Sequence, residues 1–104
     1  MTTDVRDNPE ASRYEIRVDG ARAGFAEYHL FGDLAAFLHT EIDRAYQGQG
    51  LASELIKVAL DDARARGLRV QPFCPFVRGF IDKHRDAYRD LVPAEEWPRF
   101  GLDS

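Results

Sequence analysis

The chain has 104 residues, 44% of them hydrophobic, and a formal net charge of −4. This length suffices for one compact domain with its own core, and the apolar content excludes a wholly disordered chain. The acidic balance argues against a nucleic-acid partner, which needs a basic surface to displace counterions.

A single cysteine, Cys74, allows no internal disulfide, which is typical of reducing compartments. No segment has the apolar length of a membrane span, and residues 1–8 lack the apolar stretch of a signal peptide. We therefore expect no membrane partner and a cytoplasmic location.

The first half of the chain has the pattern of antiparallel strands. Residues 1–12 are expected to form a flexible leader. Hydrophobic and charged residues then alternate from Tyr14 to Val18, and Asp19-Gly20 indicates a hairpin turn. Further strands are expected at about 22–30 and 34–43.

Strict alternation divides the side chains of residues 34–43 between two faces. The odd-numbered residues, among them Phe37, His39 and Glu41, would share one face. The even-numbered residues, among them Thr40 and Ile42, would share the other.

From Leu51 the hydrophobic period becomes helical, and Gly67 suits the end of that helix. A short strand is expected at 68–73 and a second helix at 76–84, which restarts toward Leu91 before Pro93 ends it. The expected fold is α/β (α+β), with a mostly antiparallel sheet of about four strands and two main helices. The domain would span 13–93, followed by a C-terminal tail at 94–104.

Between the third strand and the first helix lies a glycine-rich turn. The first turn of a helix offers free N–H groups and a positive dipole end, and glycines allow a phosphate to approach the backbone closely. Leu51-Ala52 stands where a P-loop needs Lys-Ser or Lys-Thr, and Ser53 replaces the third glycine of a dinucleotide fingerprint. The turn suits a pyrophosphate, although it could also be a simple connector.

The turn sequence Gln47-Gly48-Gln49-Gly50-Leu51-Ala52 resembles the Gln/Arg-x-x-Gly-x-Gly/Ala signature of the GCN5-related N-acetyltransferases. The flanking motifs, His39-Thr40-Glu41-Ile42 and Pro72-Phe73-Cys74-Pro75-Phe76, look like those of a minimal subfamily of about this length. Its members bind acetyl-coenzyme A (acetyl-CoA). The resemblance covers about 14–88 and implies a minimal fold of that family.

The resemblance also implies roles for individual residues. Backbone N–H groups of the turn would hold the pyrophosphate of acetyl-CoA, the expected co-substrate; these belong to Gln47, Gly48, Gln49, Gly50, Leu51, Ala52 and Ser53. The strand edge at Glu41 and Ile42 would bond the pantetheine arm, and one of its N–H groups would polarise the acetyl carbonyl.

Many family members carry a tyrosine on the last helix that protonates the leaving thiolate. In this chain Ile81, preceded by Phe80, occupies the corresponding position when Cys74 is aligned with the family's asparagine. Neither can donate a proton, and Tyr88 lies a full helix later. The general acid is therefore missing or different.

Three residues are candidates for catalysis. Cys74 could take the acetyl group as a covalent intermediate, or it is a small buried hydrophobic residue. His39 and Glu41 could serve as general bases for an ammonium acceptor, or they form a surface pair. The histidines and Cys74 lack the spacing of metal ligands, so no metal is expected.

A basic stretch on the last helix contains Arg78, Lys83, His84 and Arg85. It could meet the ribose phosphate of coenzyme A (CoA), or it is a solvated face.

Two functions remain open. The first is an acetyl-CoA-dependent N-acetyltransferase that acts on an unidentified small amine or protein amine, with or without a Cys74 intermediate. The alternative is a non-catalytic acetyl-CoA or acyl-CoA binding or sensing module. A monomer or weak dimer is expected in either case.

Overall fold

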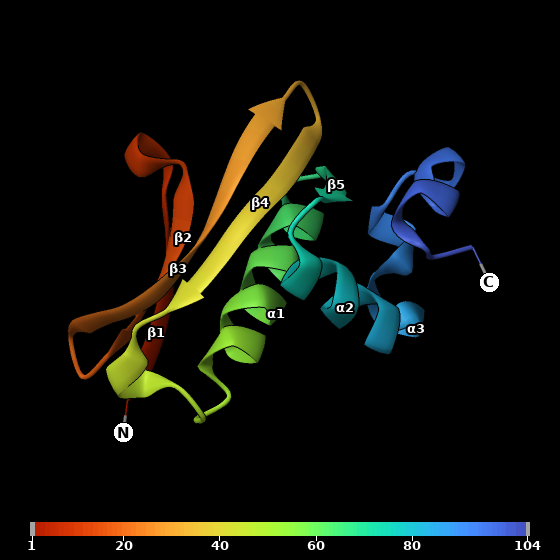
Figure 1. The fold of residues 1–104 in the computed structure, drawn as a ribbon. Coiled ribbons are helices and arrows are strands. Elements are labelled where there is room, and N and C mark those ends of the chain that lie inside the picture. Colours follow the sequence, from red (N-terminus) through yellow and green to blue (C-terminus); the bar gives the residue numbers. More distant parts are fainter. Residues whose placement is uncertain (1, 104) are drawn as a thin grey trace.

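Five strands form one mixed sheet; two α-helices lie against one of its faces, and a short third α-helix lies beyond the second (Figure 1). These elements come from a computed structural model, which describes residues 2–103. The strands follow one another in the sheet in chain order: Thr3–Asn8 (β1), Arg13–Val18 (β2), Ala21–Phe31 (β3), Leu34–Ile42 (β4) and Arg69–Pro72 (β5). The first four form an antiparallel meander, and β5 runs parallel to β4.

The parallel pair requires a crossover connection, which α1 (Leu51–Ala65) provides. Its apolar stripe is buried against the sheet, and it consists of Leu51, Leu55, Ile56, Ala59, Leu60 and Ala63. After β5 the chain forms α2 (Pro75–Lys83) and the short α3 (Arg85–Tyr88). None of the described helices is both long and apolar enough to cross a membrane.

The N-terminal segment differs from the sequence-based expectation. Residues 3–8 form β1, so the prediction of a flexible leader over 1–12 is wrong there, and the sheet has five strands rather than about four. Asp7 on this strand accepts a hydrogen bond from the Tyr28 hydroxyl (2.6 Å) and pairs with Arg66 of the C-cap of α1 (2.9 Å). These contacts come from β3 and α1, so the local sequence gave little sign of them.

An irregularity in β4 changes which side chains share a face. Glu27 of β3 lies opposite His39, whereas the next residue, Tyr28, lies opposite Phe37, so Leu38 is an extra residue on β4. Such a bulge shifts the alternation by one position. The prediction that Phe37 and His39 share a face is therefore wrong, because Phe37 is buried in the core while His39 is exposed.

The bulge lies where β4 extends beyond the end of β5. Residues Leu34 to Phe37 pair with β5, and the Cys74 N–H then donates to the Phe37 carbonyl (2.8 Å). β4 continues to Ile42, whereas the chain beyond Cys74 turns into α2. The β4 edge at 38–42 thus extends past the end of β5.

The C-terminal residues pack back onto the domain. The segment contains 3₁₀ turns at Ala94–Glu96 and Pro98–Phe100, and the side chains of Phe100 and Leu102 are buried. The Trp97 indole N–H donates to the Val92 carbonyl (2.9 Å). Arg64 of α1 forms two hydrogen bonds with Asp90, at 2.8 and 2.9 Å.

Gly24 tests the close packing of β3 on β4. A Cβ there would overlap the carbonyl oxygen of Glu41 and the side chain of Ile42. Gly24→Ala should therefore lower the free energy of unfolding by about 1–3 kcal/mol. Gly79→Ala in α2 meets open space and should raise it by up to about 1 kcal/mol. Urea unfolding measures both, and equal effects would contradict the predicted contact.

The Arg64–Asp90 pair predicts a pH dependence. The hydrogen bond from Arg64 holds the pKa of Asp90 below its ordinary 3.8. A depressed folded-state pKa stabilises the fold above 3.8, and this contribution disappears as the pH falls through the folded value. Asp90→Asn should cost less than about 1 kcal/mol at neutral pH, since both side chains are largely exposed. The difference from wild type should vanish in acid; a difference that persists there would contradict this account.

Candidate functional site

The glycine-rich turn joins β4 to α1 through two residues of left-handed backbone. Gly48 has a φ of +82° and Gly50 a φ of +75°, a region that favours glycine. The Gln47 side-chain amide donates to the Ile42 carbonyl (3.2 Å), which ties the turn to the end of β4. The turn is thus held against the strand it follows.

The first turn of α1 begins directly after Gly50. The first helical hydrogen bond runs from the Glu54 N–H to the Gly50 carbonyl (3.2 Å). The N–H groups of Leu51, Ala52 and Ser53 therefore belong to the part of a helix that offers them no internal acceptors. Together with the helix dipole, they suit an anion.

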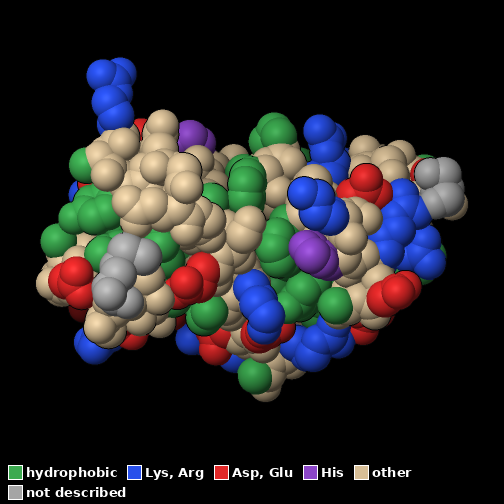
Figure 2. Space-filling model, turned by 90° about the horizontal axis from the view of Figure 1, so that it is seen from below, with side chains coloured by type: hydrophobic (Ala, Val, Ile, Leu, Met, Phe, Trp, Pro, Cys, Tyr) green, Lys and Arg blue, Asp and Glu red, His purple; other side chains and the backbone are tan. Residues whose placement is uncertain are grey.

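A cavity of about 250 Å³ lies against this turn. Its lining combines the turn residues with Ile42, Tyr46 and Phe76. A neighbouring cavity of about 320 Å³ shares Ser53 and Phe76 with it and reaches Lys83, the last residue of α2, and His84, its C-cap. The view from below shows several basic side chains, mixed with acidic ones, and a histidine over the right half of the molecule (Figure 2). The two cavities form a path from β4 along the start of α1 to α2.

The basic stretch on α2 and α3 does not act as one surface. Lys83 and His84 line the second cavity. Arg78 lies instead in a separate hollow beside Arg99. Arg85 pairs with Asp82 at 2.6 Å. Of the four residues, the structure brings Lys83 and His84 to the candidate site.

Cys74 lies on the helix side of β4. It is 4% exposed, and its Sγ is 3.5 Å from Oγ1 of Thr40. It immediately precedes α2, and its backbone makes the last link to β4 at Phe37. The thiol therefore sits where β4 and the chain after β5 separate, within the hydrophobic core cluster.

His39 and Glu41 lie on the opposite side of β4 from Cys74. Both side chains are more than half exposed, and His39 Nε2 is 3.7 Å from a carboxylate oxygen of Glu41. The His39 ring lies 6.0 Å from that of Phe25 on β3. The structure thus brings His39 and Glu41 together but separates them from Cys74 by the thickness of the strand.

The two positions considered for a general acid lie away from the turn. Ile81 is fully buried. The Tyr88 hydroxyl donates to Asp61 of α1 (2.8 Å), and burial together with this hydrogen bond raises the pKa of Tyr88. Tyr88 is therefore engaged with the C-terminal half of α1.

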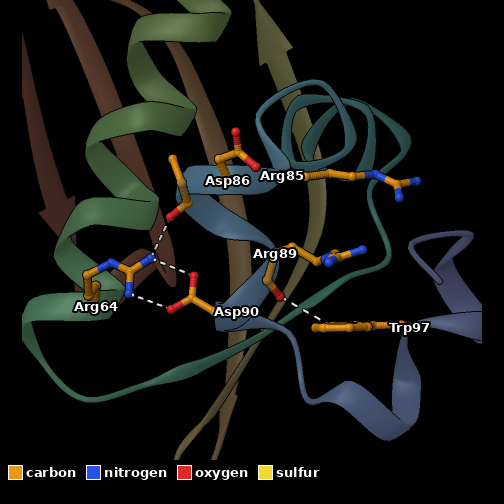
Figure 3. Close-up of a pocket in the computed structure, with 7 residues that line it drawn as sticks. Arg64, Arg85, Asp86, Arg89, Asp90 and Trp97 are labelled. Atoms are coloured by element: carbon orange, nitrogen blue, oxygen red, sulfur yellow. Dashed lines mark hydrogen bonds and ion pairs between the residues drawn. The ribbon is translucent and has the colours of Figure 1, made fainter. Parts of the chain in front are cut away.

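A larger cavity of about 470 Å³ lies at the C-terminal end of α1 (Figure 3). Arg64 and Asp90 face each other there, while Arg85 and Arg89 point toward the C-terminal segment. The Arg89 guanidinium lies over the Trp97 ring, 4.3 Å from its centroid. These charged side chains join segments of the chain to one another, so we assign this cavity a structural role and not a ligand.

Some site residues were missed from the sequence. Tyr46 and Phe76 line the two cavities but were not assigned to the cofactor. The spacing of Phe76, Phe80 and Lys83 on one face of a helix could have indicated the α2 wall. Among the described residues, no group of three or more His, Cys, Asp or Glu is placed to hold a metal ion.

Comparison with known proteins identifies the family. Residues 13–91 match the family described as GCN5-related N-acetyl-transferase. The protein NATD1 of Bos taurus is 28% identical over 74 residues, which cover 69% of this chain and 66% of the bovine protein. The chain therefore matches slightly less than two thirds of that relative's length.

Solved structures share the fold. A GCN5-like protein of Staphylococcus aureus has a TM-score of 0.64 at 18% identity, covering 86% of this chain and 87% of that one. The ribosomal-protein-S18-alanine N-acetyltransferase of Escherichia coli has a TM-score of 0.53 at 27% identity, covering 56% and 38%. A Mycobacterium tuberculosis protein solved with CoA has a TM-score of 0.55 at 22% identity, covering 74% and 50%. With its family match over 13–91, the chain belongs to the GCN5-related N-acetyltransferase family.

Proposed function

We propose that this chain binds acetyl-CoA in the path along the start of α1 and transfers the acetyl group to an amine. The observation that carries the proposal is the junction of β4 and α1. Two left-handed glycines expose the first N–H groups of a helix beside a strand edge that extends past its neighbour. Family membership supports acetyl-CoA-dependent N-acetyl transfer in general.

The pyrophosphate would lie on the backbone N–H groups of residues 47–53. The helix dipole favours a dianion there. A Cβ added to Gly50 would meet no atom within 4 Å, so the approach to the turn is open. Lys83 and His84 line the cavity beyond Ser53. They are suited to the phosphate on the ribose of CoA, whose charge would otherwise face an acidic chain.

The pantetheine arm would continue along the β4 edge at Glu41 and Ile42. An extended ligand can add to a strand edge through backbone hydrogen bonds. This route leads toward the bulge at Leu38, where an N–H group of the strand could polarise the thioester carbonyl. The acetyl group would then lie between the helix side and the open side of the sheet.

The transfer step follows from the two sides of β4. Glu41 or His39 takes a proton from the acceptor ammonium, and the free amine attacks the thioester carbon. A C–N bond forms, the C–S bond breaks, and CoA leaves as the thiolate. The amide nitrogen loses its second proton, which reaches the thiolate through water and gives the free thiol. Because an ordinary thiol has a pKa of about 8.5, the CoA thiolate can leave without a strong general acid. Direct transfer therefore needs no residue at the position of Ile81.

A route through Cys74 is the second mechanism for the same reaction. The Cys74 thiolate would attack the thioester, CoA would leave, and the amine would then attack the acetyl-cysteine. Its position beside Thr40 on the cofactor side supports this route. The near-complete burial of Cys74, and its separation from His39 and Glu41, favour direct transfer.

The acceptor is proposed as a small amine or a protein amine. The similar Escherichia coli enzyme acts, by its name, on an alanine of a ribosomal protein. A non-catalytic acyl-CoA binding module is the competing function. The observation that favours it is the burial of Ile81 and the engagement of Tyr88 with Asp61, which leave the family's usual acid position without a donor.

The cofactor turn is tested by Gly50→Glu. A carboxylate at this position would face the pyrophosphate, and juxtaposed like charges cost several kcal/mol. We expect the affinity for acetyl-CoA, measured by calorimetry, to fall by about a hundredfold or more.

The matched control is Gly67→Glu at the other end of α1. Gly67 has a φ of +73°, so both variants carry a similar backbone strain and the same added charge. Gly67→Glu should bind acetyl-CoA as wild type does. If folded Gly50→Glu binds equally well, the assignment of the turn is wrong.

The two mechanisms are separated by Cys74→Ser and by the pair His39→Gln/Glu41→Gln. Direct transfer predicts that Cys74→Ser retains turnover of an amine panel, followed by release of free thiol. The double variant should lose about a hundredfold in kcat while keeping its acetyl-CoA affinity. An acetyl adduct on Cys74 in intact-mass measurements, with turnover lost in Cys74→Ser, would establish the covalent route. Binding without turnover on any amine would favour the non-catalytic module.

A further inference from the structure

The face of the sheet opposite the helices carries a continuous row of contacts from β2 to β4. Arg13 lies over the ring of Phe25, 4.8 Å from its centroid, and Phe25 lies 6.0 Å from the His39 ring. His39 in turn lies 3.7 Å from Glu41. These side chains therefore share the open face and connect the candidate base with the second strand.

The β2 end of this row is positively charged. Glu15 is only 7% exposed, and Arg13, Arg17 and Arg22 surround it at 2.8, 3.3 and 4.0 Å. On β1, Arg6 lies opposite Glu15 and Asp4 lies opposite Arg17. With these two residues the cluster has four guanidinium groups and two carboxylates, so it keeps an excess of positive charge within a chain of net charge −4. Burial alone would raise the pKa of Glu15, but the hydrogen bonds from Arg13 and Asn8 lower it overall.

The β4 end of the row has the opposite charge. Glu41 is exposed there beside His39. Glu27 of β3 lies between the two ends, opposite His39 on one side and Arg13 on the other. Half-buried Phe25 separates the two ends. A ligand that fits this face should be cationic at the β4 edge and anionic near β2.

The spacing indicates the size of that ligand. Strands lie about 4.8 Å apart, so two steps from β4 to β2 span about 10 Å. An extended peptide covers this distance in about three residues. A small amine at the β4 edge cannot reach the arginines, whereas a peptide with acidic side chains beyond its second residue can.

We propose that the open face of β2–β4 binds the acceptor, and that the acceptor is a peptide whose free α-amino group is followed by acidic residues. This inference rests on the proposed acetyl transfer and specifies its substrate class. The ammonium would lie at Glu41 and His39, which accept its proton before the amine attacks the thioester carbon. The acidic side chains would lie at Arg17 and Arg22, which are 42% and 45% exposed.

The test compares two peptides with the same N-terminal alanine. One carries glutamate and the other lysine beyond the second residue. Affinity is measured by fluorescence anisotropy on the full chain, both free and loaded with CoA, and turnover is measured by thiol release from acetyl-CoA. Wild type should bind the glutamate peptide at least about tenfold more tightly, and raised ionic strength should weaken this binding.

The double variant Arg17→Gln/Arg22→Gln should lose this preference. Glu15 keeps Arg13 and Asn8 as partners, so the sheet should remain folded, which thermal unfolding checks. Acetyl-CoA affinity should not change. Arg78→Gln is the matched control, because Arg78 is an exposed arginine of α2 that lies in a hollow away from this face. It should retain the preference.

The outcomes separate this inference from the proposed function. If the wild-type protein does not bind acetyl-CoA, the proposed function is wrong. Retained acetyl-CoA binding with equal affinity for the two peptides, or with no peptide bound, would overturn the acceptor inference alone. A preference that survives in Arg17→Gln/Arg22→Gln would also overturn it, as would turnover of a small polyamine but of neither peptide.

Discussion

The one-residue bulge at Leu38 is the constraint on which the rest of the site depends. Before the bulge, Phe37 faces the core and β4 is paired with β5. After it, Thr40 faces Cys74 on the helix side, and His39 and Glu41 face the open side. Without the bulge, the two candidate bases would share a face with Phe37 and point toward α1. The bulge therefore lets one strand present a backbone edge to a cofactor and side chains to a different ligand.

Much of the fold follows from hydrophobic periodicity and turn residues. The hairpin at Asp19-Gly20, the start of α1 after Gly50 and the short strand near Val70 are all readable, because each is specified by local pattern. β1 is not, since its sequence, TDVRDN, has little strand character and Asp7 is held by residues distant in sequence. The bulge is not readable either, because residues 34–43 alternate in a way that is compatible with an unbroken strand.

The candidate site divides in the same way. The turn could be assigned from sequence because its glycines, and the helix that follows, form one local unit. The relation between Cys74 and the His39–Glu41 pair could not, because it depends on how β4 and β5 are paired and where that pairing ends. Only tertiary structure places Lys83 and His84 in one cavity with Ser53 of α1. The same holds for Arg22, which reaches Glu15 because β3 lies beside β2.

The single parallel pairing has a consequence for how the molecule folds. The contacts of the meander join neighbouring hairpins, whereas Leu34 meets Arg69 only after the turn and the whole of α1 have been placed. Contacts between residues far apart in sequence bear a larger loop-closure entropy and form more slowly. The meander should therefore assemble early. The site where β4 and the start of α2 separate should be completed last. By the same reasoning, this site should open first in sub-global fluctuations. In hydrogen-exchange measurements, the amide of Val70 should therefore exchange before the amides of the meander strands.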